Sequence, residues 1–532
     1  MRLGIDFGTT RSIVAFSDRG NYPVVSFMNE SGDATDWYPS VVAECSGEFR
    51  YGFDALHAAS DPSWTLLRSF KRILSDPNAS PYTQIELGKS SIAIGQLLTD
   101  FLRSLRHDIL VRSNLPRSIA RSRDMRAMVA TPANAHSTQR FLTIDAFRRA
   151  GFDVAALLNE PSAAGFEYAH RHRSTITSRR EYVVVYDLGG GTFDASLVHM
   201  TGQHHDVMTT AGAPRVGGDD FDTVLVDLVL RTAAVDRASL PKRALDQLTD
   251  LCRQAKESLN PNSRRVVVEL EPALGPRAPV PEVAIPVADF YEACMPLVER
   301  TIETMLPVMA TMEEETSAEC ASVPPTAQQP GGSEPPLADI AGIYVVGGAS
   351  ALPIIGRALR TRFGRRVHRS PYPSAATAIG LAIAGDEEAG FALTDRYSRT
   401  FGVFREELDG ARVSFDPIFT NDLRLPEGDV PFVSCRLYRP AHNIGHFRYI
   451  ECGSLDADGS PQGNITPFAE VFFPFDAALR ADDADLSHVP ICRTSAEGPL
   501  VRERYALDSH GIVELTITDL DTGYERVHRL ST

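Results

Sequence analysis

The chain has 532 residues, a length that exceeds a single hydrophobic core and predicts roughly two to four domains. Its apolar fraction of 43%, charged fraction of 23% and net charge of −16 are typical of a soluble globular protein and argue against a nucleic-acid-binding protein. The seven cysteines are scattered without a Cys-x-x-Cys pair, which indicates neither a zinc site nor a disulfide framework. No apolar run approaches the ~20 residues of a membrane span, and an apolar strand follows Met1 without a leader, so we expect a cytoplasmic protein.

The first predicted element is a strand, a turn and a second strand at the N-terminus, and the same pattern returns at 183–194. Each copy has an apolar run, an aspartate, a glycine turn, a threonine and a further apolar run. Glycine lets backbone N–H groups approach a phosphate closely, and threonine hydroxyls can donate to its oxygens. The residues assigned to phosphate in this way are Gly8, Thr9, Thr10, Gly189, Gly190, Gly191 and Thr192.

The aspartates of the two copies, Asp6 and Asp187, require a different explanation. A carboxylate repels phosphate directly, but a divalent cation between them makes both groups favourable, and magnesium is often held by one or two carboxylates and several waters. One copy alone could be an ordinary β-hairpin with a glycine turn. Two copies favour a nucleotide site with magnesium bound through water.

The remaining elements up to residue 385 alternate between strand and helix patterns, as in an α/β domain. Strands are predicted at 128–130, before Thr131-Pro132, and at 343–346, before Gly347-Gly348. Helices are predicted at 137–150 and 251–259. Residues 313–338 carry acid, serine, proline and glycine, which predicts a disordered insertion.

The character of the chain changes near residue 397. Residues 385–396 are polar and irregular, as in a domain linker. Beyond them, strand patterns separated by turn residues predict an all-β sandwich over 397–532, most clearly at Gly511–Thr518, where apolar and polar residues alternate.

Seven motifs follow one another along the chain: GIDFGTT at 4–10, FKRIL at 70–74, TPANAHSTQR at 131–140, GFDVAALLNEPSAAG at 151–165, DLGGGTFDASLV at 187–198, GGDDFD at 217–222 and VVGGASALP at 345–353. In this order they resemble the motifs of the 70-kilodalton heat-shock chaperones of DnaK type, within the actin-like ATPase superfamily. The resemblance covers 1–384 and implies two RNase H-like lobes with ATP or ADP and magnesium in the cleft between them, potassium as an accompanying cation, and ATP hydrolysis.

The resemblance also implies roles for single residues. Lys71 would position the attacking water and offset charge on the γ-phosphate, which suits the electrostatic character of phosphoryl transfer. Glu160 would lie near magnesium-bound water, and the alternative is a helix-capping carboxylate ahead of Pro161. Pro132 would relay the nucleotide state, unless it merely ends a strand. The other residues implied are Asp6, Asp187 and Asp194 at the metal and water site, Thr192 at the γ-phosphate, and Gly217, Gly218, Lys256, Gly347 and Gly348 at the nucleotide.

The chain departs from the family pattern at the adenosine end. Both arginines that stack on the base in the family are absent: Glu257 stands at one position, and the loop at 349–351 reads Ala-Ser-Ala. Because a base–guanidinium stack contributes ~1–3 kcal/mol, we expect looser nucleotide binding than in a typical member. The linker at 391–395 has fewer apolar side chains than the family's, and no sequence after Thr532 forms a helical lid, so we expect weaker coupling and faster peptide exchange.

Two functions follow from the resemblance, and a third remains open. A chaperone-like ATPase would bind unfolded or extended polypeptides under nucleotide control, with a J-domain co-chaperone and a nucleotide-exchange factor as implied partners. An ATP-dependent adaptor would bind one dedicated protein partner. A sugar kinase or filament-forming actin relative shares the first motif, but the motifs at 187–198 and 217–222 argue against it.

Overall fold

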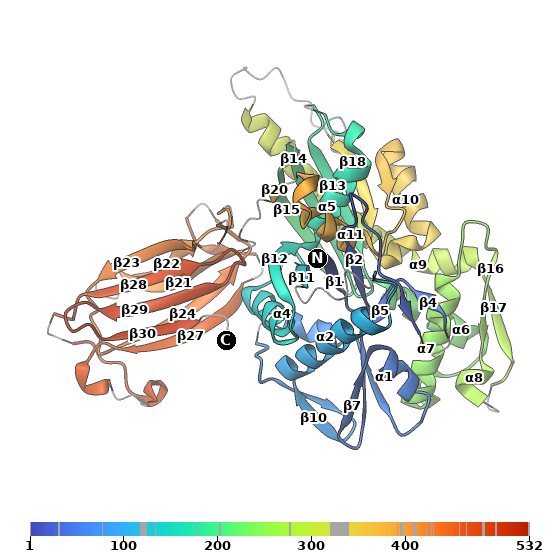
Figure 1. The fold of residues 1–532 in the computed structure, drawn as a ribbon, viewed down its shortest axis with the longest axis horizontal. Helices are drawn as coiled ribbons and strands as arrows, with labels where there is room; N and C mark the ends of the chain where they lie inside the picture. The colour runs from blue at the N-terminus through green and yellow to red at the C-terminus, as the bar shows by residue number, and fades with distance from the viewer. Residues whose placement is uncertain are drawn as a thin grey trace. The chain divides into compact units, whose positions relative to one another are not determined.

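The protein is described by a computed structural model, shown in Figure 1. The described residues are 2–529 except 30–31, 77, 117–124, 134, 178, 202–203, 276–277, 320–339, 391, 394–396, 398, 408–411, 422, 427, 429, 457, 464, 481–484 and 495–496. The chain divides into two units, each built from separate segments. Unit 1 comprises Val25–Leu158 and Thr394–Thr532, and unit 2 comprises Arg2–Val24 and Asn159–Leu393.

A six-stranded mixed sheet in the order β19-β18-β13-β14-β15-β20 forms the centre of unit 2. β13 pairs antiparallel with β14 and parallel with β18, and its Val-rich middle is buried, as in a strand covered on both faces. The strands of the sheet are β13 (Tyr182–Leu188), β14 (Thr192–Thr201), β15 (His204–Pro214), β18 (Ile340–Val346), β19 (Val367–Arg369) and β20 (Ala392–Leu393). The hairpin of β1 (Arg2–Phe7) and β2 (Arg11–Phe16) belongs to the same unit.

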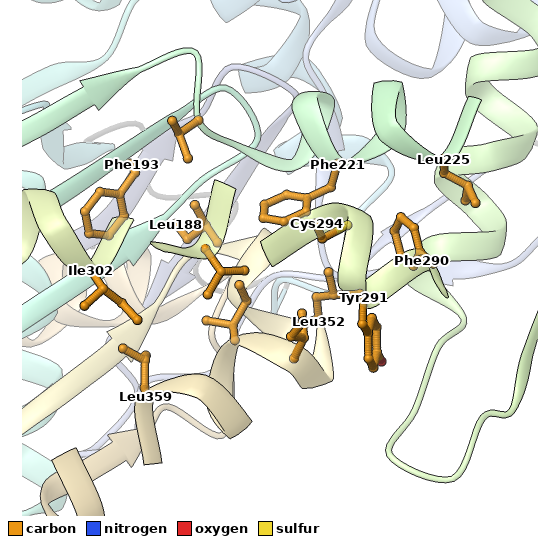
Figure 2. Packing of buried hydrophobic residues seen from close by; sticks show 14 of the residues in the cluster. Leu188, Phe193, Phe221, Leu225, Phe290, Tyr291, Cys294, Ile302, Leu352 and Leu359 are labelled. Carbon is orange, nitrogen blue, oxygen red and sulfur yellow. The ribbon is translucent and has the colours of Figure 1, made fainter. Parts of the chain in front are cut away.

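Helices α5 and α11 pack on this sheet with Val183 and Tyr344 in one cluster, and helices α6 to α10 bury their apolar residues against the sheet in a larger, extended core. Phe193 of β14, Phe221 of α6, Phe290 and Ile302 of α9, and Leu359 of α10 all belong to this core, which Figure 2 shows from close by. The helices are α5 (Glu160–Arg171), α6 (Gly218–Thr232), α7 (Lys242–Glu257), α8 (Glu271–Leu274), α9 (Val287–Glu319), α10 (Pro353–Phe363) and α11 (Ala376–Ala384), with the hairpin β16 (Arg265–Glu269) and β17 (Glu282–Pro286) beside α8 in sequence.

Three segments of unit 2 differ from the sequence-based expectations. The helix expected at 251–259 begins at Lys242, because the apolar stripe extends further toward the N-terminus. Residues 313–319 of the expected insertion are helical and complete α9, since glutamate is a good helix former, while 320–338 lie outside the described residues. Within the expected linker, β20 joins the sheet as a parallel edge strand beside β15, and 391 and 394–396 are not described.

The first segment of unit 1 contains small sheets and two longer helices. β11 and α4 match the strand at 128–130 and the helix at 137–150 predicted from the sequence. The elements are β3 (Phe27–Met28), β4 (Ala34–Thr35), β5 (Tyr38–Pro39), β6 (Val41–Cys45), β7 (Glu48–Tyr51), α1 (Gly52–Ala58), β8 (Thr65–Arg68), the 3-10 helix η1 (Phe70–Ser75), β9 (Gln84–Leu87), β10 (Ser90–Ala93), α2 (Ile94–Val111), β11 (Arg126–Thr131), α4 (Ser137–Arg149) and β12 (Asp153–Asn159).

The second segment of unit 1 forms two four-stranded antiparallel sheets, in the orders β22-β21-β24-β27 and β23-β28-β29-β30. We call these the C-terminal sheet pair. Both sheets contribute to one hydrophobic core, in which Phe401 and Tyr449 meet Tyr505 and Leu515. The strands are β21 (Thr400–Glu407), β22 (Arg412–Phe419), β23 (Phe432–Tyr438), β24 (Ile444–Cys452), β27 (Thr466–Pro474), β28 (Val501–Leu507), β29 (Val513–Asp519) and β30 (Glu525–Arg529), with the short hairpin β25 (Ser454–Leu455) and β26 (Pro461–Gln462).

Charged side chains are also buried in the C-terminal sheet pair. Glu503 of β28 is inaccessible and accepts hydrogen bonds from Arg405 of β21, with Nη2 to Oε2 at 2.6 Å, and from the hydroxyls of Tyr438 and Tyr505. Arg405 also donates to Asp416, and burial together with the Glu503 charge raises the pKa of both tyrosines. Charged side chains held by hydrogen bonds therefore occupy part of the interior, where apolar side chains would otherwise pack.

A second buried carboxylate, Glu451 of β24, lies against α4 within the same unit. It accepts hydrogen bonds from the Ser137 hydroxyl at 2.5 Å, the Ser137 backbone N–H at 3.3 Å and the Tyr397 hydroxyl at 3.2 Å. Burial raises the pKa of Glu451 although these bonds and Arg399 oppose the shift. The first turn of α4 is thus capped by a side chain from a strand far along the chain.

No helix of the described residues is long and apolar enough to span a membrane. The boundaries at 384 and 397 predicted from the sequence stay predictions, since the two units follow a different division that joins discontinuous segments.

Candidate functional site

The two predicted phosphate-binding turns lie in unit 2 and touch each other. The first connects β1 to β2 at Gly8, Thr9 and Thr10, and the second connects β13 to β14 at 189–191. A Cβ added at Gly190 would lie 2.9 Å from the Thr10 hydroxyl oxygen, so the absence of a side chain at Gly190 allows the turns to meet. The Gly189 N–H closes the second turn on the Thr192 carbonyl at 3.0 Å.

A third glycine segment, Gly217-Gly218, completes this arrangement at the start of α6. The Gly218 N–H donates to the Gly189 carbonyl at 3.0 Å, and the Asp219 N–H donates to the Gly190 carbonyl at 2.8 Å. A Cβ on Gly217 would lie 2.7 Å from the backbone nitrogen of Gly191. We call the three touching segments, 8–10, 189–191 and 217–218, the glycine cradle. In the cradle, three backbone segments approach one another without intervening side chains, at the N-terminus of a helix, which is the kind of surface that phosphate recognition uses.

The turn after β18 closes beside the Asp187 carboxylate. Gly347 has a φ of 85°, a left-handed conformation that favours glycine, and a Cβ there would lie 2.4 Å from Asp187 Oδ1. Gly348 begins the 3-10 helix η5 (Gly348–Ala351), and the Cβ of Ala349 lies 3.5 Å from a Cβ built on Gly218. The segment at 347–349 therefore adjoins both Asp187 and the glycine cradle.

The carboxylates predicted at the metal site are half-buried in unit 2. Asp187 and Asp194 face each other across the β13–β14 pair, and Asp6 lies at the end of β1 beside the first turn. Glu160 is the first residue of α5, directly after β12. Among the described residues, no group of three or more His, Cys, Asp or Glu side chains is close enough to hold a metal ion by itself. Carboxylates placed singly around phosphate-binding turns fit magnesium, which keeps several waters and uses phosphate oxygens as ligands.

Lys71 belongs to unit 1, as does Pro132, whereas the glycines and carboxylates predicted at the site belong to unit 2. It is the second residue of η1 and has only 7% of its surface exposed. Ser69 before the helix has a φ of 54°, an uncommon left-handed conformation for a residue with a side chain, and this sharp turn sets the direction of η1. The side chain of Phe70 packs on Phe101 of α2, which fixes the segment further.

Lys256, predicted to bind nucleotide, is engaged by protein groups. Its Nζ donates to the Gly218 carbonyl at 2.7 Å and lies 2.6 Å from Asp222 Oδ1. Arg253, one helical turn earlier, contacts Asp219 and Asp222. Burial alone would lower the pKa of Arg253, but the two carboxylates raise it. The basic side chains of this part of α7 thus hold the Gly218 segment of the cradle in place.

Sequence reasoning missed one contact at the site. Arg11, directly after Thr10, forms an ion pair with Glu257 at the end of α7, with Nη2 and Oε2 at 2.5 Å. Nothing in the motif patterns indicates this pair, because the two residues are 246 positions apart. Only the fold brings the first turn and the end of α7 together.

Paired hairpins with touching glycine turns and an adjoining glycine segment at a helix N-terminus fit the ATP-binding domain of the actin-like ATPase superfamily. The chain belongs to the Hsp70 protein family, whose family model matches residues 2–323. Membership confirms the family resemblance and carries an ATP-binding function of chaperone type, with magnesium as the general companion of the nucleotide.

Proposed function

We propose that this protein binds ATP with magnesium at the glycine cradle and hydrolyses it to ADP and phosphate, and that the nucleotide controls binding of unfolded or extended polypeptide by the C-terminal sheet pair. The observation that carries the proposal is the contact among the three glycine segments. A Cβ at Gly190 or Gly217 would collide with a neighbouring segment, and this closeness is what a backbone site for phosphates needs.

Each site residue has a chemical part in this proposal. Asp6 and Asp187 hold magnesium through water, Thr192 donates to the γ-phosphate, and Asp194 and Glu160 orient water near the metal. Lys71 offsets the charge that develops as the phosphoryl group transfers, and it positions the attacking water. The arrangement of two RNase H-like lobes followed by a β-sandwich, and a cytoplasmic location, belong to the same proposal.

The polypeptide-binding part is supported by the exposed surface of the C-terminal sheet pair. β22 and β23 are edge strands of their sheets, and an edge strand offers unpaired backbone groups to an extended peptide. Val413 on β22 and Leu437 on β23 each have 61% of their surface exposed. Apolar side chains on two edge strands fit an extended polypeptide with apolar residues.

A second candidate, an adaptor for one dedicated partner, is favoured by the ion pairs that the half-buried Arg405 makes with Asp416 and with the inaccessible Glu503. A rigid, charge-containing interior adapts less readily to varied apolar clients than a purely apolar one. A panel of unrelated extended peptides separates the two functions. A chaperone binds many of them and releases them on ATP, whereas an adaptor ignores the panel and retains one protein from its host.

The central test is steady-state ATP hydrolysis with and without a reduced, alkylated unfolded protein. The Lys71→Ala variant should hydrolyse ATP about 100-fold more slowly than wild type, in line with the loss of a preorganised charge at a transferring group. Lys89→Ala removes an exposed lysine of the same unit and serves as the matched control, with hydrolysis unchanged. Equal rates for Lys71→Ala and wild type would overturn the catalytic assignment.

A further inference from the structure

The basic side chains around the glycine cradle differ in how far they are committed to protein carboxylates. Lys256 is only 8% exposed and Arg253 22% exposed, and both are held by the acids of the 219–222 segment. Arg11 is 33% exposed and is paired with Glu257, itself 42% exposed. Of these three cations, Arg11 is therefore the most accessible to a bound ligand.

Arg11 also connects the two ends of the site. It follows Thr10, whose side chain lies against Gly190 in the cradle. Its partner Glu257 follows Lys256, whose Nζ lies 3.5 Å from a Cβ built on Gly218. The guanidinium thus extends from the phosphate-binding turn to the C-terminal end of α7.

Near the end of α7, the described side chains nearest to a Cβ built on Gly218 are those of Ala349 and Lys256, and neither carries a flat ring to receive a base. Gly218 adjoins Ala349 on one side and Lys256 on the other, and Ala349 is too small to cover a purine ring. In the proposed ATP site the phosphates lie on the turns at 8–10 and 189–191, and Ala349 and the end of α7 adjoin this site at Gly218. A planar guanidinium at this place can stack on the base and keep a carboxylate at its edge.

We propose that Arg11, oriented by Glu257, stacks on the base of the bound nucleotide and sets its affinity. The inference rests on the proposed ATP site and deepens it. Arg11 is the contact residue and Glu257 is a positioning residue. Position 257 of α7 and the 349–351 loop have no arginine, and the β1–β2 hairpin supplies the guanidinium instead. Nucleotide binding is therefore tighter than expected from the loss of both stacking arginines.

Calorimetry with two probes, magnesium-ADP and magnesium-pyrophosphate, tests the contact. Arg11→Ala should weaken ADP binding about tenfold or more and leave pyrophosphate binding unchanged, because only ADP carries a base. Arg11→Lys keeps the charge but loses the planar face, and it should weaken ADP binding similarly. Arg243→Ala removes an exposed arginine from α7 and is the matched control, with no change for either probe.

The positioning role of Glu257 has its own readout. Glu257→Gln should weaken ADP binding about threefold, as expected for one weakened hydrogen bond, and leave pyrophosphate binding unchanged. The exchange variant R11E/E257R returns a guanidinium to the same place and should recover ADP affinity. Tighter ADP binding by Glu257→Gln would show that Glu257 withholds Arg11 from the site and would overturn the inference.

The remaining outcomes separate this inference from the proposed function. If wild type binds neither probe, the proposed ATP site is wrong and the inference falls with it. If wild type binds ADP and Arg11→Ala and Arg11→Lys bind it equally well, only the inference is wrong. Equal losses of ADP and pyrophosphate binding in Arg11→Ala would place the guanidinium on the phosphates instead and also overturn the base contact. Thermal unfolding of each variant verifies that it is folded.

Discussion

The glycine cradle and the C-terminal sheet pair depend on opposite kinds of residue: glycines without side chains in the first, and charged side chains inside the core in the second. In the cradle, side chains are removed so that backbone segments touch, and Gly217 stands against Gly191 with no room for a methyl group. In the sheet pair, full-sized charged side chains are placed inside, and Arg405 meets Glu503 between the sheets. The cradle depends on the absence of side chains, and the sheet pair depends on an ion pair inside its core. Single substitutions should therefore affect the two regions differently.

The largest effect is expected in the sheet pair. Glu503→Ala should lower the free energy of unfolding by about 3–5 kcal/mol, because it removes the inaccessible carboxylate that accepts hydrogen bonds from Arg405, Tyr438 and Tyr505. Urea unfolding measures the loss. Glu497→Ala breaks the exposed pair with Arg439, in which Glu497 is 79% exposed, and should change stability by less than about 1 kcal/mol. Similar losses in both variants would mean that burial does not distinguish the two pairs.

A substitution in the glycine cradle should reduce ADP binding more than it reduces the stability of the fold. Gly217→Ala places a methyl group 2.7 Å from two backbone atoms of Gly191, so the two segments must move apart. We expect ADP affinity to fall at least about tenfold and stability to fall by about 1–3 kcal/mol. Gly356→Ala in α10 meets nothing within 4 Å and should be neutral or stabilising by up to about 1 kcal/mol. Unchanged ADP binding by Gly217→Ala would remove the basis for the cradle as a phosphate site.

The smallest effect is a pH dependence at Glu451. Its folded pKa is raised by burial above the usual value of about 4.3, so its contribution to stability is fully present below that value and is lost as pH rises through the folded pKa. Relative to Glu451→Gln, wild type should therefore gain stability on acidification from pH 7.5 toward about pH 4.5, measured by thermal unfolding. Burial would raise the pKa of Asp416 too, but hydrogen bonds from Arg436 and Arg405 hold it low, so Asp416→Asn should show no such trend above about pH 4.

The cradle could be predicted from the sequence because its signal is local. Strand, aspartate, glycine and threonine follow one another directly, and the structure places both copies in hairpins. The strand and helix around Thr131-Pro132 follow from equally local patterns. The pair of Arg11 and Glu257 could not be predicted, since each looks like a solvated surface charge until the fold joins them.

The charged side chains inside the sheet pair could not be predicted from the sequence for another reason. Glu503 stands at an inward position of β28, between the inward Val501 and Tyr505, but alternation rules assign a charged residue to the outer face. The inward position is stabilised by Arg405 from the facing sheet, and sequence periodicity contains no information about that partner. The division into two discontinuous units was missed similarly, because contact between distant segments leaves no local pattern.

The short strand β20 is expected to be a weak attachment point of the unit 2 sheet when the chain is under tension. Its pairing with β15 involves only Ala392 and Leu393, whereas β14 and β15 pair along almost their whole length. Tension applied to the chain beyond residue 393 would peel β20 from the sheet edge before any central strand gives way. Such a pull would reach the sheet at β15, whose partner β14 follows the second turn of the glycine cradle.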